Sequence, residues 1–394
     1  MKFKVRDKLR WFYQVFVAAP KAWKLPSHSD VVIYHSVGSD LVSQYLGGAS
    51  SQVLALNGDL INIPVLMKSM FTRSFWLGRP DRAYVESFLN FVQPKIVISF
   101  IDNDALFYEI SAQFRGMKSI LLQNGTRDNW LDQLPVRDDW QVDVMFVHNP
   151  SIGEYYQSRI DGKIIPSGSL KNNLVPSTSM KYADEVLYLS QYHQKSDPRK
   201  PIVFDANGKA YSWENFFAID ELLIEYLDLW CSTHGKTLRI CGRETKESDS
   251  EHQYFKERIT KSPWVYEASS SALSAYQLID AANMIVTIDS TLGYESLARG
   301  KKTAFFTGRG EFVNSSARRF GWPGSLPKTG PFWASSVNAD EVCRVMDYLA
   351  GESNAQWQKT CQVYAPQVMG FDPGNTILQS TLQHFLTSEQ LNHA

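Results

Sequence analysis

Side chains that could bind a phosphate follow an apolar run late in the sequence. Residues Met284–Ile288 are apolar and largely β-branched, which predicts a buried strand of a parallel sheet. Asp289, Ser290 and Thr291 end this run with side chains that favour a helix N-terminus, and Leu292–Arg299 follows with helical spacing. The free amides and positive end of such a helix attract an anion. The segment is therefore a predicted phosphate site, or else an ordinary strand–helix–strand unit with a well-capped helix.

Two further groups in the same half are candidates for the same ligand. Glu295 lies four residues after Thr291 and so on the same helix face, where its carboxylate could hold the diol of a ribose. Gly242 and Arg243 follow the predicted strand Thr237–Cys241. The Arg243 cation would then lie at the same edge of a parallel sheet as Ser290.

In the first half, carboxylates and a histidine follow predicted strands. Asp102 and Asp104 come after the strand Lys95–Ile101, and one of them is a candidate general base for an acceptor hydroxyl. Capping of the next helix by Asp102 or Asn103 is an equally good explanation. His35, after the strand Val31–Tyr34, is either a reserve base or a loop histidine bonded to backbone.

Other polar residues at strand ends are candidates for binding a second substrate. The side-chain amides of Gln123 and Asn124, followed by Gly125, could bind sugar hydroxyls, but the same three residues are also common in an ordinary turn. Arg127 and Lys171 could neutralise a phosphate or carboxylate, or they could be solvated surface charges. The candidates are Asn103, Gln123, Asn124, Arg127, Ser169 and Lys171.

The elements that position these residues alternate between strands and helices, which predicts parallel, doubly wound sheets. The pattern is interrupted at 173–184, which we interpret as a linker. We therefore expect a basic, aromatic N-terminal segment (1–29), a first Rossmann-like domain (30–175) and a second one with C-terminal helices (176–394). Two such domains would face each other across a cleft at the carboxyl ends of their strands.

Composition excludes several classes of function. At 394 residues two domains are the default, and a net charge of −1 argues against a dedicated nucleic-acid binder. No GxGxxG or GxxxxGK[ST] motif supports a dinucleotide oxidoreductase or a P-loop protein. Scattered cysteines and histidines predict no metal site. Although residues 102–104 form a DxD, helix dipoles and basic side chains can do the work of a metal, so we expect no metal requirement and no cofactor.

The N-terminal segment is the one stretch that suggests a membrane. No apolar run reaches the ~20 residues that span a bilayer. Five basic residues within the first ten precede Trp11, Phe12 and Tyr13. We expect either a helix packed on the protein itself or a peripheral anchor on anionic lipid, and a cytoplasmic location in either case.

Five segments together resemble one family. IDSTLGYESLARGKKTAFF, ISFIDNDALFYEIS, LLQNGTR, PSGSLKNN and FGWPG are similar to segments of surface-carbohydrate biosynthesis transferases with a GT-B fold. The resemblance extends from about Val31 to about Trp333. It implies a glycosyltransferase of O-antigen or capsule synthesis, with a nucleotide-sugar donor on the second domain and a glycan acceptor on the first.

The turn Ser290-Thr291 also resembles the phosphate turn of transferases that use CMP-linked Kdo or sialic acid, which makes a CMP-ulosonic acid a candidate donor. Those transferases carry a His-Pro pair where this chain has Gly242-Arg243, so UDP- and GDP-sugars stay open. We expect a direct displacement in which Asp102 or Asp104, with His35 in reserve, activates the acceptor. Two alternatives remain, a nucleotide-sugar epimerase of the same plan and a non-catalytic scaffold of polysaccharide assembly.

Overall fold

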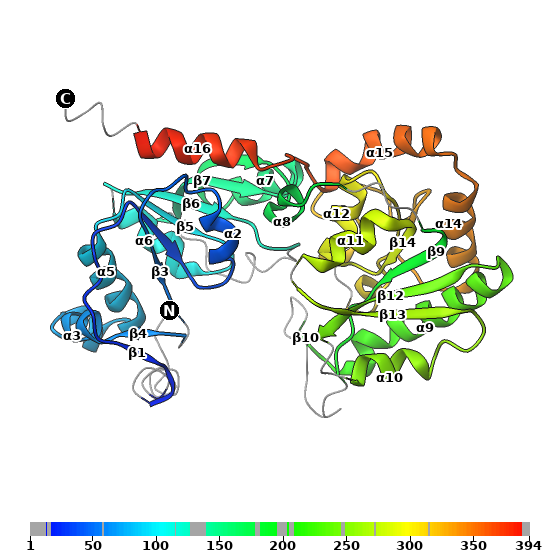
Figure 1. Ribbon diagram of the computed structural model, residues 1–394, viewed down its shortest axis with the longest axis horizontal. Helices are drawn as coiled ribbons and strands as arrows, with labels where there is room; N and C mark the ends of the chain where they lie inside the picture. Colours follow the sequence, from blue (N-terminus) through cyan, green and yellow to red (C-terminus); the bar gives the residue numbers. More distant parts are fainter. Residues whose placement is uncertain are drawn as a thin grey trace.

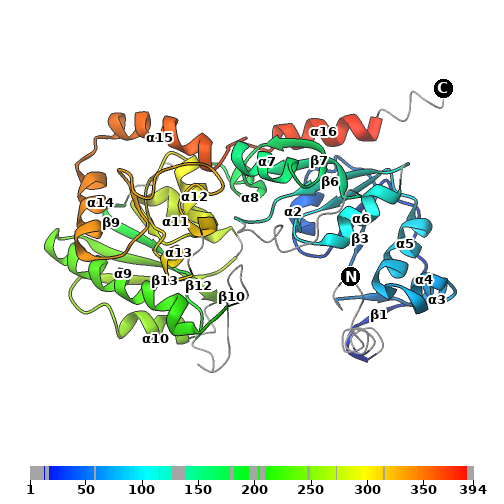
Figure 2. The ribbon, with the colours of Figure 1, turned by 180° about the vertical axis from the view of Figure 1, so that it is seen from behind.

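Two six-stranded parallel sheets, one in each half of the chain, form the framework of the protein (Figures 1 and 2). The computed structural model describes residues 13, 17–56, 59–114, 116–126, 139–177, 182–194, 203–204, 209–245, 249–271, 273–313 and 316–387. The expected α/β class and the two-sheet GT-B plan are confirmed. Residues 1–12 and 14–16 of the basic segment, and Arg127, lie outside the described residues.

The first sheet is buried on both faces. Its strands, in spatial order, are β3 (Ser51–Leu54), β2 (Val31–Tyr34), β5 (Ile96–Ser99), β6 (Lys118–Leu122), β7 (Gln141–Val147) and β8 (Asp161–Pro166). Alternate residues of each strand enter two separate cores: Val32 and Val97 on one face, Ile33 and Ile98 on the other. Such apolar strands fit the middle of a parallel sheet that helices cover on both sides.

Helices cover the two faces of this sheet unequally. On one face lie α3 (Ile63–Met70), α4 (Arg73–Leu77), α5 (Pro80–Val92), α6 (Ala105–Gln113) and α7 (Pro150–Gln157). On the other face lie α2 (Ser39–Ser43), α8 (Leu170–Leu174) and α16 (Thr376–Thr387). A short parallel pair, β1 (Lys21–Ala22) and β4 (Ile61–Asn62), lies beside α3.

The second sheet has the strand order of a dinucleotide-binding fold. Its strands are β13 (Trp264–Ser269), β12 (Thr237–Thr245), β9 (Tyr182–Leu189), β14 (Ala282–Thr287), β15 (Lys302–Phe306) and β16 (Trp333–Ala334). Because the order reverses between β9 and β14, the loops after these two strands diverge and leave a crevice there. A short antiparallel pair, β10 (Val203–Phe204) and β11 (Ala210–Tyr211), precedes the first long helix.

The helices of the second half surround this sheet. They are α9 (Trp213–Thr233), α10 (Ser250–Lys256), α11 (Ser274–Ala281), α12 (Thr291–Ala298), α13 (Arg309–Phe312), a 3₁₀ turn η3 (Ser316–Arg318), α14 (Ala339–Gly351) and α15 (Asn354–Val368). Residues from α9, α12, α14 and α15 share one core, and α11 packs on the opposite face.

The chain returns to the first half at its C-terminal end. Figure 1 shows α15 over the second sheet and α16 over the first. Leu378 and Leu382 of α16 are buried in the core that contains Val31 and Ile33. The sequence pattern assigned the C-terminal helices to the second domain, but the apolar face of α16 completes the first one. Among the described residues, no helix has the length and apolarity needed to cross a membrane.

Candidate active site

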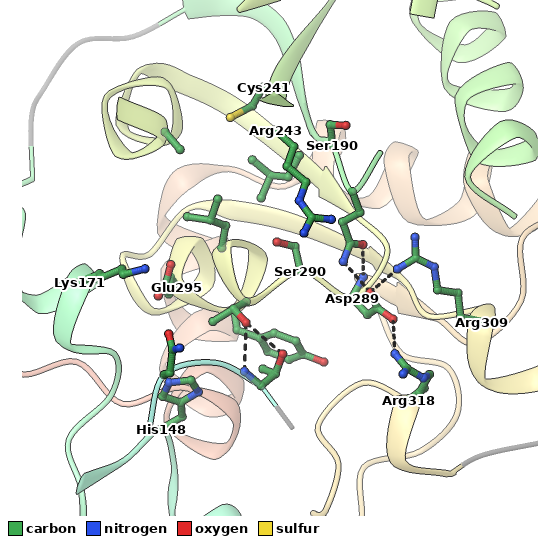
Figure 3. Close-up of a pocket in the computed structure, with 18 of the residues that line it drawn as sticks. His148, Lys171, Ser190, Cys241, Arg243, Asp289, Ser290, Glu295, Arg309 and Arg318 are labelled. Carbon is green, nitrogen blue, oxygen red and sulfur yellow. Dashed lines mark hydrogen bonds and ion pairs between the residues drawn. The ribbon is translucent and has the colours of Figure 1, made fainter. Parts of the chain in front are cut away.

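A cavity of about 890 Å³ lies between the carboxyl ends of the two sheets. The ends of β6 and β7 and the helix α8 line one side. The ends of β9, β12, β13 and β14 and the segment after β15 line the other. Figure 3 shows His148 and Lys171 on the first side, with Arg243, Ser290 and Asp289 across the cavity. Residues distant in sequence are thus brought to one space because parallel strands present their carboxyl ends at a common edge.

The N-terminus of α12 is open toward this cavity. Ser290 precedes the helix in extended conformation, and its side chain caps no amide of the first turn. Gly293 lets the helix approach β14 and β15 closely, since a Cβ there would lie 2.4 Å from Thr287 Cγ2 and 3.1 Å from Phe305 Cε1. The Gly293 amide bonds to the Ser290 carbonyl at 2.9 Å, whereas the Thr291 and Leu292 amides and the Ser290 hydroxyl remain available to an anion.

A buried carboxylate positions the segment that carries Arg243. Glu251 of α10 is fully buried and accepts hydrogen bonds from the Arg243 amide at 2.9 Å, the Glu244 amide at 2.7 Å and Tyr266 Oη at 2.9 Å. The Ser190 hydroxyl donates to it as well. These bonds join the ends of β9, β12 and β13. The Arg243 side chain itself is exposed, and it makes no ion pair with a described carboxylate.

His193 lies against this arginine. Arg243 Nη1 donates to His193 Nε2. Partial burial and the charges of Arg243 and Arg309 lower the pKa of His193 to about 4. The ring is therefore neutral at pH 7 and serves as an acceptor that orients the guanidinium.

Asp289 organises the crevice at the strand-order reversal. Its Oδ1 accepts hydrogen bonds from Gln191 Nε2 at 2.8 Å and Arg309 Nη1 at 2.9 Å, and Arg318 Nη1 lies 3.8 Å from its Oδ2. Arg309 is also held by Asp220, at 2.7 Å and 2.9 Å. Burial alone would lower the pKa of Arg309, but the two carboxylates raise it, so the guanidinium stays charged. Asp289 therefore positions Arg309 and Arg318 at the cavity.

Glu295 lines the cavity but already has protein partners. Tyr276 Oη donates to it at 2.8 Å, and the Ser169 hydroxyl also bonds to it. Burial raises the pKa of Glu295, while these hydrogen bonds and the cations Lys171 and Arg299 oppose the rise. Ser169 thus contacts Glu295 from the first half, and is not itself among the lining residues.

The wall of the first half offers amides, a histidine and a lysine. Gln123 Oε1 accepts from the His148 amide at 2.8 Å, and Gln123 Nε2 donates to the Gly125 carbonyl at 2.9 Å, so this turn is fixed. Asn124 and Lys171 line the same wall. The two walls meet where Thr126 bonds to Thr291: the Thr126 amide and hydroxyl lie 3.1 Å and 3.0 Å from the Thr291 hydroxyl.

Asp102 does not face the cavity. It is fully buried, and its carboxylate accepts from the Asn124 amide at 3.1 Å and from Tyr156 Oη at 2.7 Å. The expectation that Asp102 activates an acceptor does not fit this structure, because Oδ1 supports the Gln123–Asn124 turn and Oδ2 holds Tyr156 of α7.

Asp104 and His35 do not line the cavity either. Asp104 Oδ1 caps α6 through the Leu106 amide at 2.9 Å, and its Oδ2 lies 3.1 Å from His35 Nε2. His35 is buried, with a backbone φ of 89°. The helix cap is thus Asp104 rather than Asp102 or Asn103, and the His35 ring contacts a carboxylate rather than the backbone. Asn103 beside them is exposed outside the cavity.

The predicted donor-side residues and part of the acceptor set come together. Gly242, Arg243, Asp289, Ser290, Thr291 and Glu295 all line the cavity, as do Gln123, Asn124 and Lys171. Several lining residues were missed. His148, Gln191 and Arg309 each follow a strand within three residues, so the rule that found Ser290 applies to them too. Arg318, on a 3₁₀ turn, carries no such signal.

Cations outnumber carboxylates on the described lining. The cations are Lys171, Arg243, Arg309, Arg318 and Arg319, and the carboxylates are Asp289 and Glu295. Low-dielectric walls strengthen this excess, so the cavity favours an anionic ligand. Within the described part of the chain, no group of three or more His, Cys, Asp or Glu could hold a metal ion.

Comparison with known proteins gives one matching family and several solved structures that resemble this chain. A family described as "putative O-antigen biosynthesis protein" matches residues 120–386. A putative UDP-N-acetylglucosamine 2-epimerase from Listeria monocytogenes has a similar structure (TM-score 0.55, 10% identity, 95% of this chain and 98% of that chain). So has S. aureus MnaA with UDP (TM-score 0.54, 9%, 92% and 96%). The wall teichoic acid polymerase TagF aligns with a TM-score of 0.49 (12%, 92% and 90%). No curated protein matches the sequence.

Proposed function

The chain belongs to the putative O-antigen biosynthesis protein family, and from this premise we propose that it is a glycosyltransferase. It would move a sugar from a nucleotide donor, bound to the second half, to a hydroxyl of a surface-glycan acceptor, bound to the first half. The cavity between the two halves is where donor and acceptor would meet.

The observation that carries this proposal is the open N-terminus of α12 in a cavity with an excess of cations. Ser290 and the first-turn amides suit a phosphate, and Arg243 lies across the same space (Figure 3). A nucleotide phosphate is the anion that a sugar donor releases. A nucleotide-sugar donor therefore explains both the excess of cations in the cavity and their position near the N-terminus of α12.

The proposed reaction is direct displacement at the anomeric carbon. The acceptor oxygen attacks that carbon, its proton passes to a base, and the bond to the phosphate oxygen breaks. The α12 N-terminus, Ser290 and Arg243 stabilise the negative charge that develops on the leaving phosphate. Glu295 remains our candidate for the ribose.

We propose His148 as the base in place of Asp102 or Asp104. His148 lies at the end of β7 on the acceptor wall, and the Gln123 side chain fixes its backbone. The other histidine of the described lining, His193, lies on the donor side and bonds to Arg243. His148 lies across the cavity from Ser290 (Figure 3), which is where a base that deprotonates the acceptor hydroxyl must lie.

The donor is proposed to be CMP-linked, with an ulosonic acid as sugar. This rests on the likeness of the Ser290-Thr291 turn to the phosphate turns of such transferases. One helix N-terminus also suits the single phosphate of a CMP donor. UDP- and GDP-sugars are the competing donors.

Calorimetry with CMP, UDP and GDP tests the donor site. We expect one nucleotide to bind, and Ser290→Ala and Arg243→Ala each to weaken it at least about tenfold, since each removes a charge-assisted contact. Ser380→Ala, an exposed serine on α16, is the matched control. Binding of none of the three would overturn the proposal and leave the scaffold alternative.

A turnover assay separates transfer from epimerisation. A transferase releases nucleotide only when an acceptor glycan is present, whereas an epimerase converts its donor alone. His148→Gln should lower turnover at least about a hundredfold while nucleotide affinity stays within about twofold. Conversion without acceptor would replace the transferase proposal with the epimerase.

A further inference from the structure

An exposed apolar surface lies on α3 and α4 of the first half, far from the second half (Figure 2). We call Met67, Phe71, Trp76 and Leu77 the α3–α4 surface. Their exposed fractions are 56%, 88%, 55% and 72%. Both helices bury other apolar side chains, such as Val65 and Phe75. The helical hairpin formed by α3 and α4 therefore has one apolar side in the core and a second one exposed to solvent. Monomeric proteins seldom expose an apolar patch of this kind unless it binds something.

The strand β1 extends this surface. It pairs with β4, just before α3, and Asn62 Nδ2 donates to the Lys24 carbonyl at 2.8 Å. Trp23 and Leu25 flank that carbonyl and are 75% and 55% exposed. Phe71, Trp23 and Leu77 are the three most exposed large apolar side chains among the described residues.

The charge of the same segments is positive throughout. Residues 17–27 and 60–80 contain no Asp or Glu, although the whole chain has a net charge of −1. Their basic residues are Lys21, Lys24, Lys68, Arg73 and Arg79. Arg79 pairs with Asp81 and Glu109, but Lys24, Lys68 and Arg73 are exposed and form no ion pair with a described carboxylate. Nearby Asp59 accepts from the Ser36 hydroxyl.

The connectivity places α3 and α4 between β3 and α5, and Figure 2 shows both helices far from the second half. The hairpin follows the carboxyl end of β3, and α5 then returns the chain to the amino end of β5.

We propose that the α3–α4 surface docks on a bilayer of anionic phospholipid. Aromatic and aliphatic side chains would enter the interface, and the lysines and arginines between them would contact lipid phosphates. Scattered cations without carboxylates suit an anionic lipid surface better than a second copy of this chain, which would bring like charges together. This proposal goes beyond the transferase reaction and does not rest on it.

Vesicle sedimentation tests the docking. The full chain is mixed with vesicles of phosphatidylcholine, with or without phosphatidylglycerol. We expect binding to the mixed vesicles and loss on raising salt. The double variant Phe71→Ser/Leu77→Ser should lower partitioning at least about tenfold, since two apolar side chains no longer enter the interface. Leu229→Ser/Val363→Ser, at 46% and 58% exposure in the second half, is the matched control.

Charge and self-association give independent readouts. Lys68→Glu/Arg73→Glu should weaken binding to vesicles that contain phosphatidylglycerol and leave binding to pure phosphatidylcholine vesicles unchanged. The proposal is overturned if the wild type binds neither vesicle, or if Phe71→Ser/Leu77→Ser binds as the wild type does, which would assign lipid binding to another segment. It is also overturned if sedimentation velocity shows a dimer that this double variant dissociates.

Discussion

At the scale of single residues, Asp220 and Glu221 show how burial decides the strength of an ion pair. The two are adjacent on α9, and each binds an arginine at similar distance: Asp220 to Arg309 at 2.7 Å, Glu221 to Arg258 at 2.6 Å. The Asp220 and Arg309 side chains are 8% and 3% exposed, whereas those of Glu221 and Arg258 are 38% and 28% exposed. Water therefore screens the second pair only.

We expect Asp220→Ala to lower the free energy of unfolding of the second domain by about 3–5 kcal/mol, because Arg309 would stay buried with one carboxylate fewer. Glu221→Ala should cost less than about 1 kcal/mol. Urea unfolding of both variants measures the difference. Equal effects would mean that Arg309 reaches solvent once Asp220 is removed.

The residue scale also shows where sequence reasoning succeeds. Ser290 and Arg243 were found because polar side chains after parallel strands gather at one edge. The same rule selected Asp102, but could not tell that its carboxylate turns inward to Tyr156. The direction of a side chain depends on partners distant in sequence, and a single sequence does not display them.

At the scale of elements, the position of α12 depends on a glycine at its first turn. A Cβ on Gly293 would meet Thr287 and Phe305, which are both buried. By contrast, a Cβ on Gly351, the last residue of α14, would meet no other atom within 4 Å. One helix is held close to its sheet, and the other ends in open space.

Gly293→Ala should therefore destabilise the protein by about 1–3 kcal/mol and weaken nucleotide binding, because α12 must move away from the sheet. Gly351→Ala should be neutral or slightly stabilising. Thermal unfolding and calorimetry on both variants provide the measurement. Unchanged nucleotide affinity in Gly293→Ala would show that the close approach of α12 to its sheet is unimportant for binding.

Elements were predicted unevenly, for physical reasons. The strands next to the site were found because they are short, apolar and β-branched, as in β14 and β5. The helix α15 was not predicted. It contains Pro366 and few apolar residues in register, and packing of Trp357 and Cys361 on the second core stabilises it. Stabilisation by packing against residues distant in sequence cannot be predicted from the local periodicity of a segment.

At the scale of the whole molecule, the crossover before α16 ties the two halves together. The Gly370 amide donates to the His148 carbonyl at 2.6 Å, and Asn375 Nδ2 donates to Tyr45 Oη at 2.7 Å and the Leu170 carbonyl at 3.0 Å. The segment that leaves α15 therefore supports the acceptor wall. The sequence pattern predicted C-terminal helices, but could not show which core receives α16.

Leu382→Ala should lower the stability of the first domain by about 2–5 kcal/mol, since Leu382 is 1% exposed in a core shared with β2. Ile377→Ala, on the exposed side of the same helix at 37%, should change it by less than about 1 kcal/mol. Hydrogen exchange locates the effect: amides of β2 and β5 should exchange faster in Leu382→Ala. If those of β14 respond instead, α16 supports the other half.

The path of α16 has a consequence for biosynthesis. A ribosome translates the first sheet and then the entire second half before residues 376–387 emerge to cover Val31, Ile33 and Ile98. Until then only α2 and α8 cover this face of the early sheet. The nascent chain must therefore keep that face from aggregating, alone or with a chaperone, through the synthesis of some two hundred further residues.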